Sequence, residues 1–292
     1  MNVKLTKGAL SFLASEYANA PAAKARSHVI PAPMELSVSY GGGAARGPRA
    51  ILKASDQLEA HDRGVAPGHY GIHTQPAIKL SRQASAEAWI DAIEKRVARA
   101  LAVGAKPLIL GGEHTVTLGA ARAFSKAGLD IGFVHFDAHA DLRDTYEGSP
   151  FSHACVMRRV AELGFPIAQF GTRAISEDEN QYRRKHRQIS AIDAETLMNA
   201  PLPNRLLPPR FPKAIYITFD LDGLDPSQMP ATGTPVAGGI FWHQAMQILD
   251  RVAMGRTVIG GDVVELAPIA GLHFADFTAA QLTHRLLALM TK

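Results

Sequence analysis

The chain has 292 residues, of which 47% are hydrophobic and 20% charged, and it carries a formal net charge of +4. These values are typical of a globular protein with a substantial core, and they exclude an intrinsically disordered chain. The basic excess is too small to indicate nucleic-acid binding. We interpret the densest basic run, residues 183–187, as a solvated helix face or loop.

Cysteine content and hydropathy narrow the cellular context. The single cysteine, Cys155, excludes an internal disulfide and a cysteine-cluster metal site. The first ten residues lack the apolar stretch of a signal peptide, and no apolar run approaches the about 18 residues of a membrane span. We therefore expect a cytoplasmic protein that does not bind a membrane.

Short apolar runs alternate with longer amphipathic ones along the chain. In chain order, this pattern predicts a helix over 84–103, strands over 107–110 and 131–136, a helix over 153–163, a strand over 214–219, a helix over 241–254, a strand over 257–261 and a helix over 278–290. Strands that alternate with helices indicate an α/β fold: a three-layer α/β/α arrangement around a central parallel sheet.

Two segments interrupt this alternation. Residues 40–49 form a glycine-rich loop that lacks the lysine and the serine or threonine of a phosphate-binding P-loop. Residues 200–212 form a proline-rich surface connection, which could link two domains. Because strands and helices alternate on both sides of it, we expect a single domain spanning residues 1–292.

Polar segments follow three of the four predicted strands directly. The first holds His114, which alone is more typical of a hydrogen-bonded structural histidine. The second holds Asp137, His139 and Asp141, at a spacing that places all three side chains on one face of an extended segment. Such a convergence after a buried strand is unfavourable without a cation.

The third segment repeats this spacing with Asp220 and Asp222, whereas Asp225 is expected to fix the following turn. Ligand sites of parallel sheets lie at the carboxyl ends of the strands, where these segments meet. Two imidazoles and four carboxylates exceed the three protein ligands of a catalytic zinc ion. They suit two metal ions sharing bridging carboxylates, and oxygen-rich ligation without thiolate favours two Mn²⁺. Such a pair can lower the pKa of a bridging water enough to supply hydroxide.

These segments together resemble the ureohydrolase family, which includes arginases, agmatinases, guanidinobutyrases and formiminoglutamases, and most closely its agmatinase branch. The resemblance is carried by GGEHTVTLG (111–119), FDAHADLR (136–143) and TFDLDGLDPSQMPATGTPVAGG (218–239), and it extends to GPRAILKAS (47–55) and VVELAP (263–268). It therefore spans most of the chain. It implies an arginase-like fold, a small-molecule guanidino substrate, and a homo-oligomer, usually a trimer or hexamer.

The resemblance assigns metal-binding roles to the six side chains. It implies that His114 and His139 bind different ions and that Asp137 and Asp220 bridge them. The remaining two, Asp141 and Asp222, complete the two sites, and Asp141 also hydrogen-bonds the bridging hydroxide.

Further positions resemble the family's catalytic and substrate-binding residues. His153 resembles a proton-shuttling histidine, although it could simply begin a helix capped by Ser152. Glu265 resembles the carboxylate that pairs with the substrate guanidinium, where a surface charge or cap is the alternative. Thr234 aligns with a polar residue that lines the family's substrate pocket. The alternative is that Thr234 only shapes a turn. Glu113 is expected to orient its neighbours.

The implied reaction is attack of the bridging hydroxide on the guanidinium carbon, followed by protonation of the departing amine through His153, which gives urea and an amine. Residues 142–152 are expected to contact the far end of the substrate. Asp144 or Glu147 would favour an amine end there, unless they are merely solvated, whereas Arg143 would favour a carboxylate end. Agmatine, giving putrescine, is favoured, with aminopropylagmatine, guanidinobutyrate and arginine as alternatives.

Two other classes remain open. Zinc deacetylases share the fold but use fewer carboxylates, so the doubled Asp-x-Asp pattern argues against them. A non-catalytic metal-binding homologue is the non-enzyme alternative, although such a protein would be expected to lose ligands, and all six are present. Metal content separates the hydrolase from the deacetylase, because two manganese ions per chain indicate the hydrolase and one zinc ion indicates a deacetylase.

Overall fold

The fold is known from a computed structural model, which describes residues 10–81 and 83–292; most of the N-terminal segment examined for a signal peptide lies outside these ranges. The described residues form one sheet of eight strands in the order β2-β1-β3-β8-β7-β4-β5-β6, in which every pairing is parallel. The strands are β1 (Ser27–Ala32), β2 (Ile72–Thr74), β3 (Lys106–Gly111), β4 (Ile131–Phe136), β5 (Ile167–Phe170), β6 (Ile189–Ile192), β7 (Ala214–Asp220) and β8 (Thr257–Val264).

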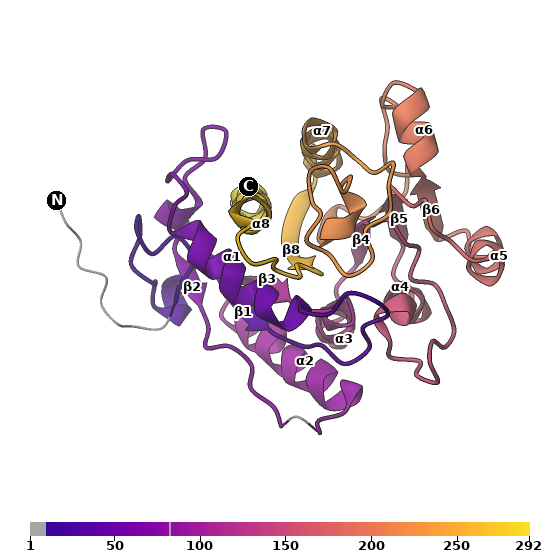
Figure 1. The fold of residues 1–292 in the computed structure, drawn as a ribbon. Helices are drawn as coiled ribbons and strands as arrows, with labels where there is room; N and C mark the ends of the chain where they lie inside the picture. The colour runs from indigo at the N-terminus through magenta and orange to yellow at the C-terminus, as the bar shows by residue number, and fades with distance from the viewer. Residues whose placement is uncertain (1–9, 82) are drawn as a thin grey trace.

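Helices cover both faces of this sheet (Figure 1). One hydrophobic cluster lies on each face of the sheet, because successive strand residues point to opposite sides. On one side the cluster includes residues of α1 (Gly47–Ser55), α6 (Ala194–Asn199), α7 (Trp242–Ala253) and α8 (His273–Met290). On the other it includes α2 (Ala86–Ala102), α3 (Val116–Lys126) and α4 (Val156–Glu162), with α5 (Glu177–Lys185) packed at its margin. The predicted three-layer α/β/α fold is therefore confirmed.

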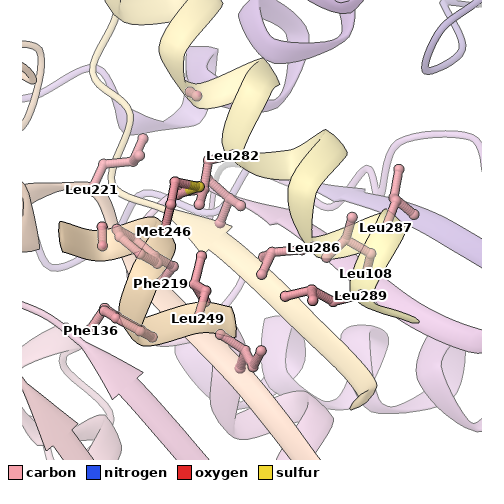
Figure 2. Packing of buried hydrophobic residues seen from close by; sticks show 14 of the residues in the cluster. Leu108, Phe136, Phe219, Leu221, Met246, Leu249, Leu282, Leu286, Leu287 and Leu289 are labelled. Atoms are coloured by element: carbon pink, nitrogen blue, oxygen red, sulfur yellow. The ribbon is translucent and has the colours of Figure 1, made fainter. Parts of the chain in front are cut away.

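The core under α7 and α8 anchors the central strands. Figure 2 shows Met246 and Leu249 of α7 and Leu282 of α8 near Phe219 of β7, whereas Leu286 of α8 lies toward Leu108 of β3. All of these side chains are buried, and burial of each contributes about 1.5–3 kcal/mol. This packing fixes the central part of the sheet, at whose edge the polar segments emerge.

The four strands predicted from the sequence are the four adjacent central strands, β3, β8, β7 and β4. The predicted helices are also present, with shifted ends. The helix expected over 153–163 begins as a 3₁₀ turn, His153–Cys155, before α4, and the one expected over 278–290 begins earlier, as α8. The glycine-rich segment 40–49 is a loop only in its first part, because a 3₁₀ turn, Ala44–Arg46, leads into α1 at Gly47.

The proline-rich connection 200–212 contains no helix or strand. Three of its apolar side chains are nevertheless buried: Leu206, Leu207 and Phe211. The strand that follows it, β7, pairs with β4 and β8 inside the same sheet. The strands before and after the connection, β6 and β7, therefore belong to the same sheet. Within residues 10–81 and 83–292, no helix has the length and hydropathy needed to cross a membrane.

Candidate active site

The carboxyl ends of three of the four central strands bring together all of the residues predicted to bind metal. His114 follows β3, Asp137, His139 and Asp141 follow β4, and Asp220 ends β7 just before Asp222. Because parallel strands end at the same edge, segments separated by over a hundred residues meet there. All six side chains are buried except that of His139, which is about 30% exposed.

His114 lies at the centre of the first group of side chains. Its Nδ1 atom is 3.1 Å from Oδ2 of Asp137, 3.0 Å from Oδ2 of Asp141 and 3.4 Å from Oδ2 of Asp220. Yet among the described residues this buried nitrogen has no hydrogen-bond partner of suitable geometry. A buried imidazole nitrogen that faces three carboxylates without a well-formed hydrogen bond is the arrangement expected of a metal ligand.

His139 forms the second group. Its Nδ1 atom lies 3.1 Å from Oδ2 of Asp222 and 3.4 Å from Oδ1 of Asp137. Asp137 therefore presents one oxygen to each imidazole, Oδ2 to His114 and Oδ1 to His139. Two sets of donor atoms lie close enough together to hold a metal ion: those of His114, His135, Asp137 and Asp141, and those of Asp137, His139 and Asp222. Asp220 is not in either set, although its Oδ2 atom faces His114.

The electrostatics of these groups call for added positive charge. Burial and the neighbouring carboxylates of Asp222 and Asp137 raise the pKa of Asp220 well above its usual range. The pKa of Asp222 is raised by burial and by Asp137. Burial disfavours the charged form of His139, but hydrogen bonds to Asp137 and Asp222 outweigh it and raise its pKa to about 12. Without a cation, protons are drawn in to balance the carboxylates.

A hydrogen-bonded chain beneath the site orients His114. Its Nε2 atom lies 2.8 Å from the Thr218 hydroxyl, which lies 3.3 Å from that of Thr117. Thr117 and Tyr216 both donate to Oδ2 of the buried Asp262, at 2.8 and 2.9 Å. With a proton on Nε2 donated to Thr218, Nδ1 keeps its lone pair toward the carboxylates. The residues present therefore fit divalent metal ions, because the donors are carboxylate oxygens and a correctly oriented imidazole.

Glu265 directly follows β8 and is the fourth contribution to this edge. Its backbone has a φ of 65°, in the left-handed region, and Asp141 is similar at 53°. Such values are uncommon for residues other than glycine and concentrate at functional sites. Burial and the nearby Glu113 carboxylate raise the pKa of Glu265 well above its usual range. A cationic partner would restore its negative charge.

His153 lies at the rim, held by two serines that the sequence did not reveal. Its Nδ1 atom is 3.1 Å from the Ser37 hydroxyl and its Nε2 atom is 2.9 Å from the Ser39 hydroxyl. Ser152 makes no side-chain capping hydrogen bond at the following turn, so the alternative interpretation as a simple capped helix start gains no support. His153 instead lines the same cavity as Asp141 and Glu265.

The Glu113 side chain holds a loop in place and makes no hydrogen bond to a predicted metal ligand among the described residues. Its Oε2 atom accepts hydrogen bonds from the backbone N–H groups of Leu36 and Ser37, at 2.5 and 2.7 Å, and its Oε1 atom accepts from the Ser37 hydroxyl at 3.0 Å. The loop after β1 is thereby fixed beside His153. No signal in the sequence linked this loop to the site, because the contact joins positions more than 70 residues apart.

Comparison with known proteins places this geometry in a family. The family model described as "Arginase family" matches residues 25–288. The chain belongs to the Arginase family. It is 37% identical to an N(1)-aminopropylagmatine ureohydrolase of Synechocystis sp., over 97% of this chain and 95% of that protein. It is 34% identical to an agmatinase of Bacillus anthracis, over 81% and 82%.

The fold of this Arginase-family enzyme also resembles solved structures. The agmatine ureohydrolase of Thermoplasma volcanium matches 98% of the chain with a TM-score of 0.84 and 28% identity, over 96% of that structure. The predicted resemblance to ureohydrolases is thus confirmed, and the chain is an enzyme of that hydrolase class. Its buried histidine and aspartate groups could hold the metal ions on which such enzymes depend.

The cavity lined by Asp141, His153 and Glu265 is the inner cavity of the site. An outer cavity of about 510 Å³ continues from it and is lined by residues that include Arg143, Tyr146, Arg173 and Thr234. Thr234 also lines the inner cavity, with its hydroxyl 3.4 Å from Oδ2 of Asp222. Arg173 was not predicted from the sequence; its guanidinium donates to backbone carbonyls, including those of Asp222 and Val236.

The two acids expected to contact the substrate do not line either cavity in the Arginase-family enzyme. Asp144 is exposed and forms ion pairs with Arg158 and Arg159. Glu147 is exposed at the tip of a turn, with a φ of 49°. Of the three charged residues considered in this loop, only Arg143 reaches the cavity, where its guanidinium lies 5.2 Å from the centre of the Tyr146 ring.

Proposed function

We propose that this Arginase-family enzyme is a dinuclear manganese ureohydrolase that releases urea from the guanidino end of a linear amine. The observation that carries this proposal is the position of Asp137, whose two carboxylate oxygens face the separate imidazoles of His114 and His139. A carboxylate so placed can bridge two ions. Asp220 would be the second bridge, with Asp141 and Asp222 completing the sites. When bound, the two ions lower the pKa of a water molecule enough to make it a nucleophile near neutral pH.

The chain's own residues would position the substrate and move the protons. Glu265 binds the planar guanidinium, since it is a partly buried carboxylate that lacks a cationic partner among the described residues. Asp141 accepts a hydrogen bond from the attacking water and stabilises the tetrahedral centre. His153, with its ring held by Ser37 and Ser39, delivers the proton that the departing amine requires.

The substrate we propose is N(1)-aminopropylagmatine, with agmatine as the second candidate. The stretch LRDTYEGSPFSHACVMRR, residues 142–159, resembles the agmatinase branch and favoured agmatine. Relatives at 37% identity, however, are named N(1)-aminopropylagmatine ureohydrolases, and those at 34% are named agmatinases. The outer cavity gives a longer chain room to extend beyond Thr234. Guanidinobutyrate stays a candidate because Arg143 lines that cavity.

The test is urea release by the manganese-loaded enzyme from a panel of N(1)-aminopropylagmatine, agmatine, guanidinobutyrate and arginine. We expect the highest kcat/KM with the first compound. Higher kcat/KM with agmatine would reverse the order of the two candidates. Absence of urea from all four, with two manganese ions bound, would contradict the hydrolase proposal.

We propose three further properties on the strength of the family resemblance. Residues 1–292 form a single domain, the enzyme works in the cytoplasm, and it assembles as a homo-oligomer, either a trimer or a hexamer. Light scattering coupled to size-exclusion chromatography tests the last of these. A monomer at micromolar concentration would contradict it.

A further inference from the structure

Two buried polar residues that are not among the predicted ligands lie directly beneath the metal-binding carboxylates. His135 of β4 and Gln169 of β5 are partners in the register of the two parallel strands. Both are buried, with exposed fractions of 0% and 1%. The Nε2 atom of His135 lies 2.8 Å from Oδ2 of Asp137, and its Nδ1 atom lies 3.1 Å from the Nε2 atom of Gln169.

The partners of Gln169 fix the direction of these hydrogen bonds. Its amide nitrogen lies 2.8 Å from the carbonyl oxygen of Ala140, which can only accept. The same nitrogen therefore donates its second proton to Nδ1 of His135, which must accept this hydrogen bond. In the described part of the chain, Oε1 of Gln169 has no partner, so flipping the amide would gain nothing and would set two oxygens against each other.

A histidine that accepts at Nδ1 carries its proton on Nε2. His135 therefore donates to Oδ2 of Asp137, although its position alone would also suit a metal ligand. The other Asp137 oxygen accepts from the backbone N–H of His139 at 2.6 Å. Together the two hydrogen bonds hold both oxygens of this carboxylate, leaving little freedom to rotate.

We propose that His135 and Gln169 are positioning residues that hold Asp137 in the orientation required to bind two metal ions, and that His135 is not itself a ligand. Gln169 acts twice, because it also fixes the carbonyl of Ala140, which lies between His139 and Asp141 in the chain. This inference rests on the proposed dinuclear site. Residues that orient metal ligands in this way typically change metal affinity by about 10- to 100-fold.

The first experiment compares His135→Gln with His135→Leu by calorimetric titration of Mn²⁺ into the metal-free full-length protein. Glutamine places an amide N–H near the position of Nε2 and can still donate to Asp137, whereas leucine fills similar space without a donor. We expect manganese affinity within about 3-fold of wild type for His135→Gln and a loss of about 10- to 100-fold for His135→Leu.

Thermal unfolding of the metal-free variants separates positioning from simple packing. If His135 only filled the core, leucine would be the better tolerated residue in both measurements. Our proposal instead predicts that His135→Gln binds manganese more tightly than His135→Leu whatever their order of thermal stability. Equal manganese affinities for the two variants would overturn it.

The second experiment tests Gln169. In Gln169→Glu the carboxylate cannot donate to Ala140 and draws the His135 proton onto Nδ1, so that a bare Nε2 faces Asp137. We expect manganese affinity to fall by about 10- to 100-fold. The control is Gln188→Glu, since the exposed Gln188 also donates to a backbone carbonyl, that of Ala161, at 2.7 Å, and this bond lies outside the site. Unchanged affinity in Gln169→Glu, or an equal loss in the control, would overturn the proposal.

Nitrogen NMR of the imidazoles reads the tautomer directly. In the metal-free wild type we expect His135 to carry its proton on Nε2, and a proton on Nδ1 would overturn the inference. None of these measurements depends on turnover. If the wild type binds two manganese ions and releases no urea from the substrate panel, the proposed reaction fails while the positioning of Asp137 can still be supported.

Discussion

The backbone N–H of His114 donates a hydrogen bond to Oε1 of Glu265 over 2.7 Å. This bond ties the segment after β3 to the residue after β8, and the N–H of Glu265 strengthens the tie by donating to the carbonyl of Gly112 at 2.8 Å. The left-handed backbone of Glu265 is held by these contacts. Its carboxylate is thereby fixed relative to the first metal-binding histidine before any substrate arrives.

We predict that Glu265→Gln lowers kcat/KM by about 100-fold, the equivalent of about 3 kcal/mol, because the amide can still accept from His114 but no longer pairs with the charge of the guanidinium. Steady-state urea release measures this effect. Manganese content should stay at the wild-type value. A variant with unchanged kcat/KM would show that the guanidinium binds elsewhere.

His153→Ala should lower kcat by about 10²- to 10⁴-fold, the usual contribution of a general acid, while leaving manganese content intact. Ser39→Ala, which removes only the hydroxyl 2.9 Å from Nε2 of His153, should have a smaller effect. Both are measured with saturating substrate. Loss of manganese in His153→Ala would instead identify His153 as a structural residue or a ligand.

The sequence alone predicted that these polar side chains lie together, because the strands that they follow are central. Strands β3, β4, β7 and β8 are covered on both faces and therefore read as continuous apolar runs. The polar residues that follow them stand out against this background. The spacing in FDAHAD and in FDLD then indicated which side chains share a face, whereas the assignment of bridging and terminal roles came only from the family resemblance.

The outer strands could not be predicted in this way. Strand β1 contains a proline, Pro31, which argues against a paired strand. It is tolerated because the neighbouring β2 pairs only with Ser27–Val29, so Pro31 lies beyond the ladder on that side. Strands β5 and β6 have four residues each, too few for a periodicity to emerge.

The residues that support the site were missed for a related reason. The roles of Gln169 and Ser37 depend on which segments become neighbours. That information lies in the pairing of β4 with β5 and in the loop held by Glu113, and not in local spacing. For Asp144 and Glu147 the sequence left a substrate contact and a solvated acid as alternatives, and both side chains are exposed in the structure.

The geometry of the two groups predicts different metal losses on mutation. Asp137→Ala should abolish binding of both ions, since its oxygens face both imidazoles. Asp222→Ala should retain one ion, because Asp222 contacts only His139 of the two. Elemental analysis of the purified variants against a wild type with about two manganese ions per chain measures this. A wild type containing a single zinc ion would favour the deacetylase alternative.

Arg143 offers a test of which substrate end the outer cavity accepts. Removing its positive charge in Arg143→Met should lower KM for agmatine and N(1)-aminopropylagmatine a few-fold, because repulsion at this partly exposed position is screened by solvent. KM for guanidinobutyrate should rise. Glu147→Gln serves as the control and should change neither by more than about 2-fold, since a solvated charge away from the cavity is strongly screened. Equal effects of Arg143→Met on all three substrates would mean that Arg143 does not contact the substrate's far end.

The hydrogen bonds of Asp225 lead us to predict that the stability of the metal-free protein depends on pH. Its Oδ1 atom accepts from the Ser227 N–H and hydroxyl, and its Oδ2 atom accepts from the N–H groups of Gly238 and Gly239. Burial alone would raise the pKa of this carboxyl, but the four hydrogen bonds outweigh it and lower the pKa to about 2. Asp225, which the sequence predicted would fix a turn, thus also ties the segment after β7 to Gly238 and Gly239, at the end of the loop that carries Thr234.

Because the folded pKa of Asp225 lies below the unfolded value of about 3.9, the unfolded chain binds more protons between these values. The stabilisation is complete above the unfolded pKa and is lost as the pH falls through about 2. Asp225→Asn, whose amide cannot accept all four hydrogen bonds, should lower the free energy of unfolding at pH 7 by about 1 kcal/mol. Urea denaturation of the metal-free wild type and variant between pH 3 and pH 7 measures the difference. We expect it to be constant above about pH 5 and to narrow toward pH 3; a difference that widens on acidification would have the wrong sign for a carboxylate stabilised by these donors.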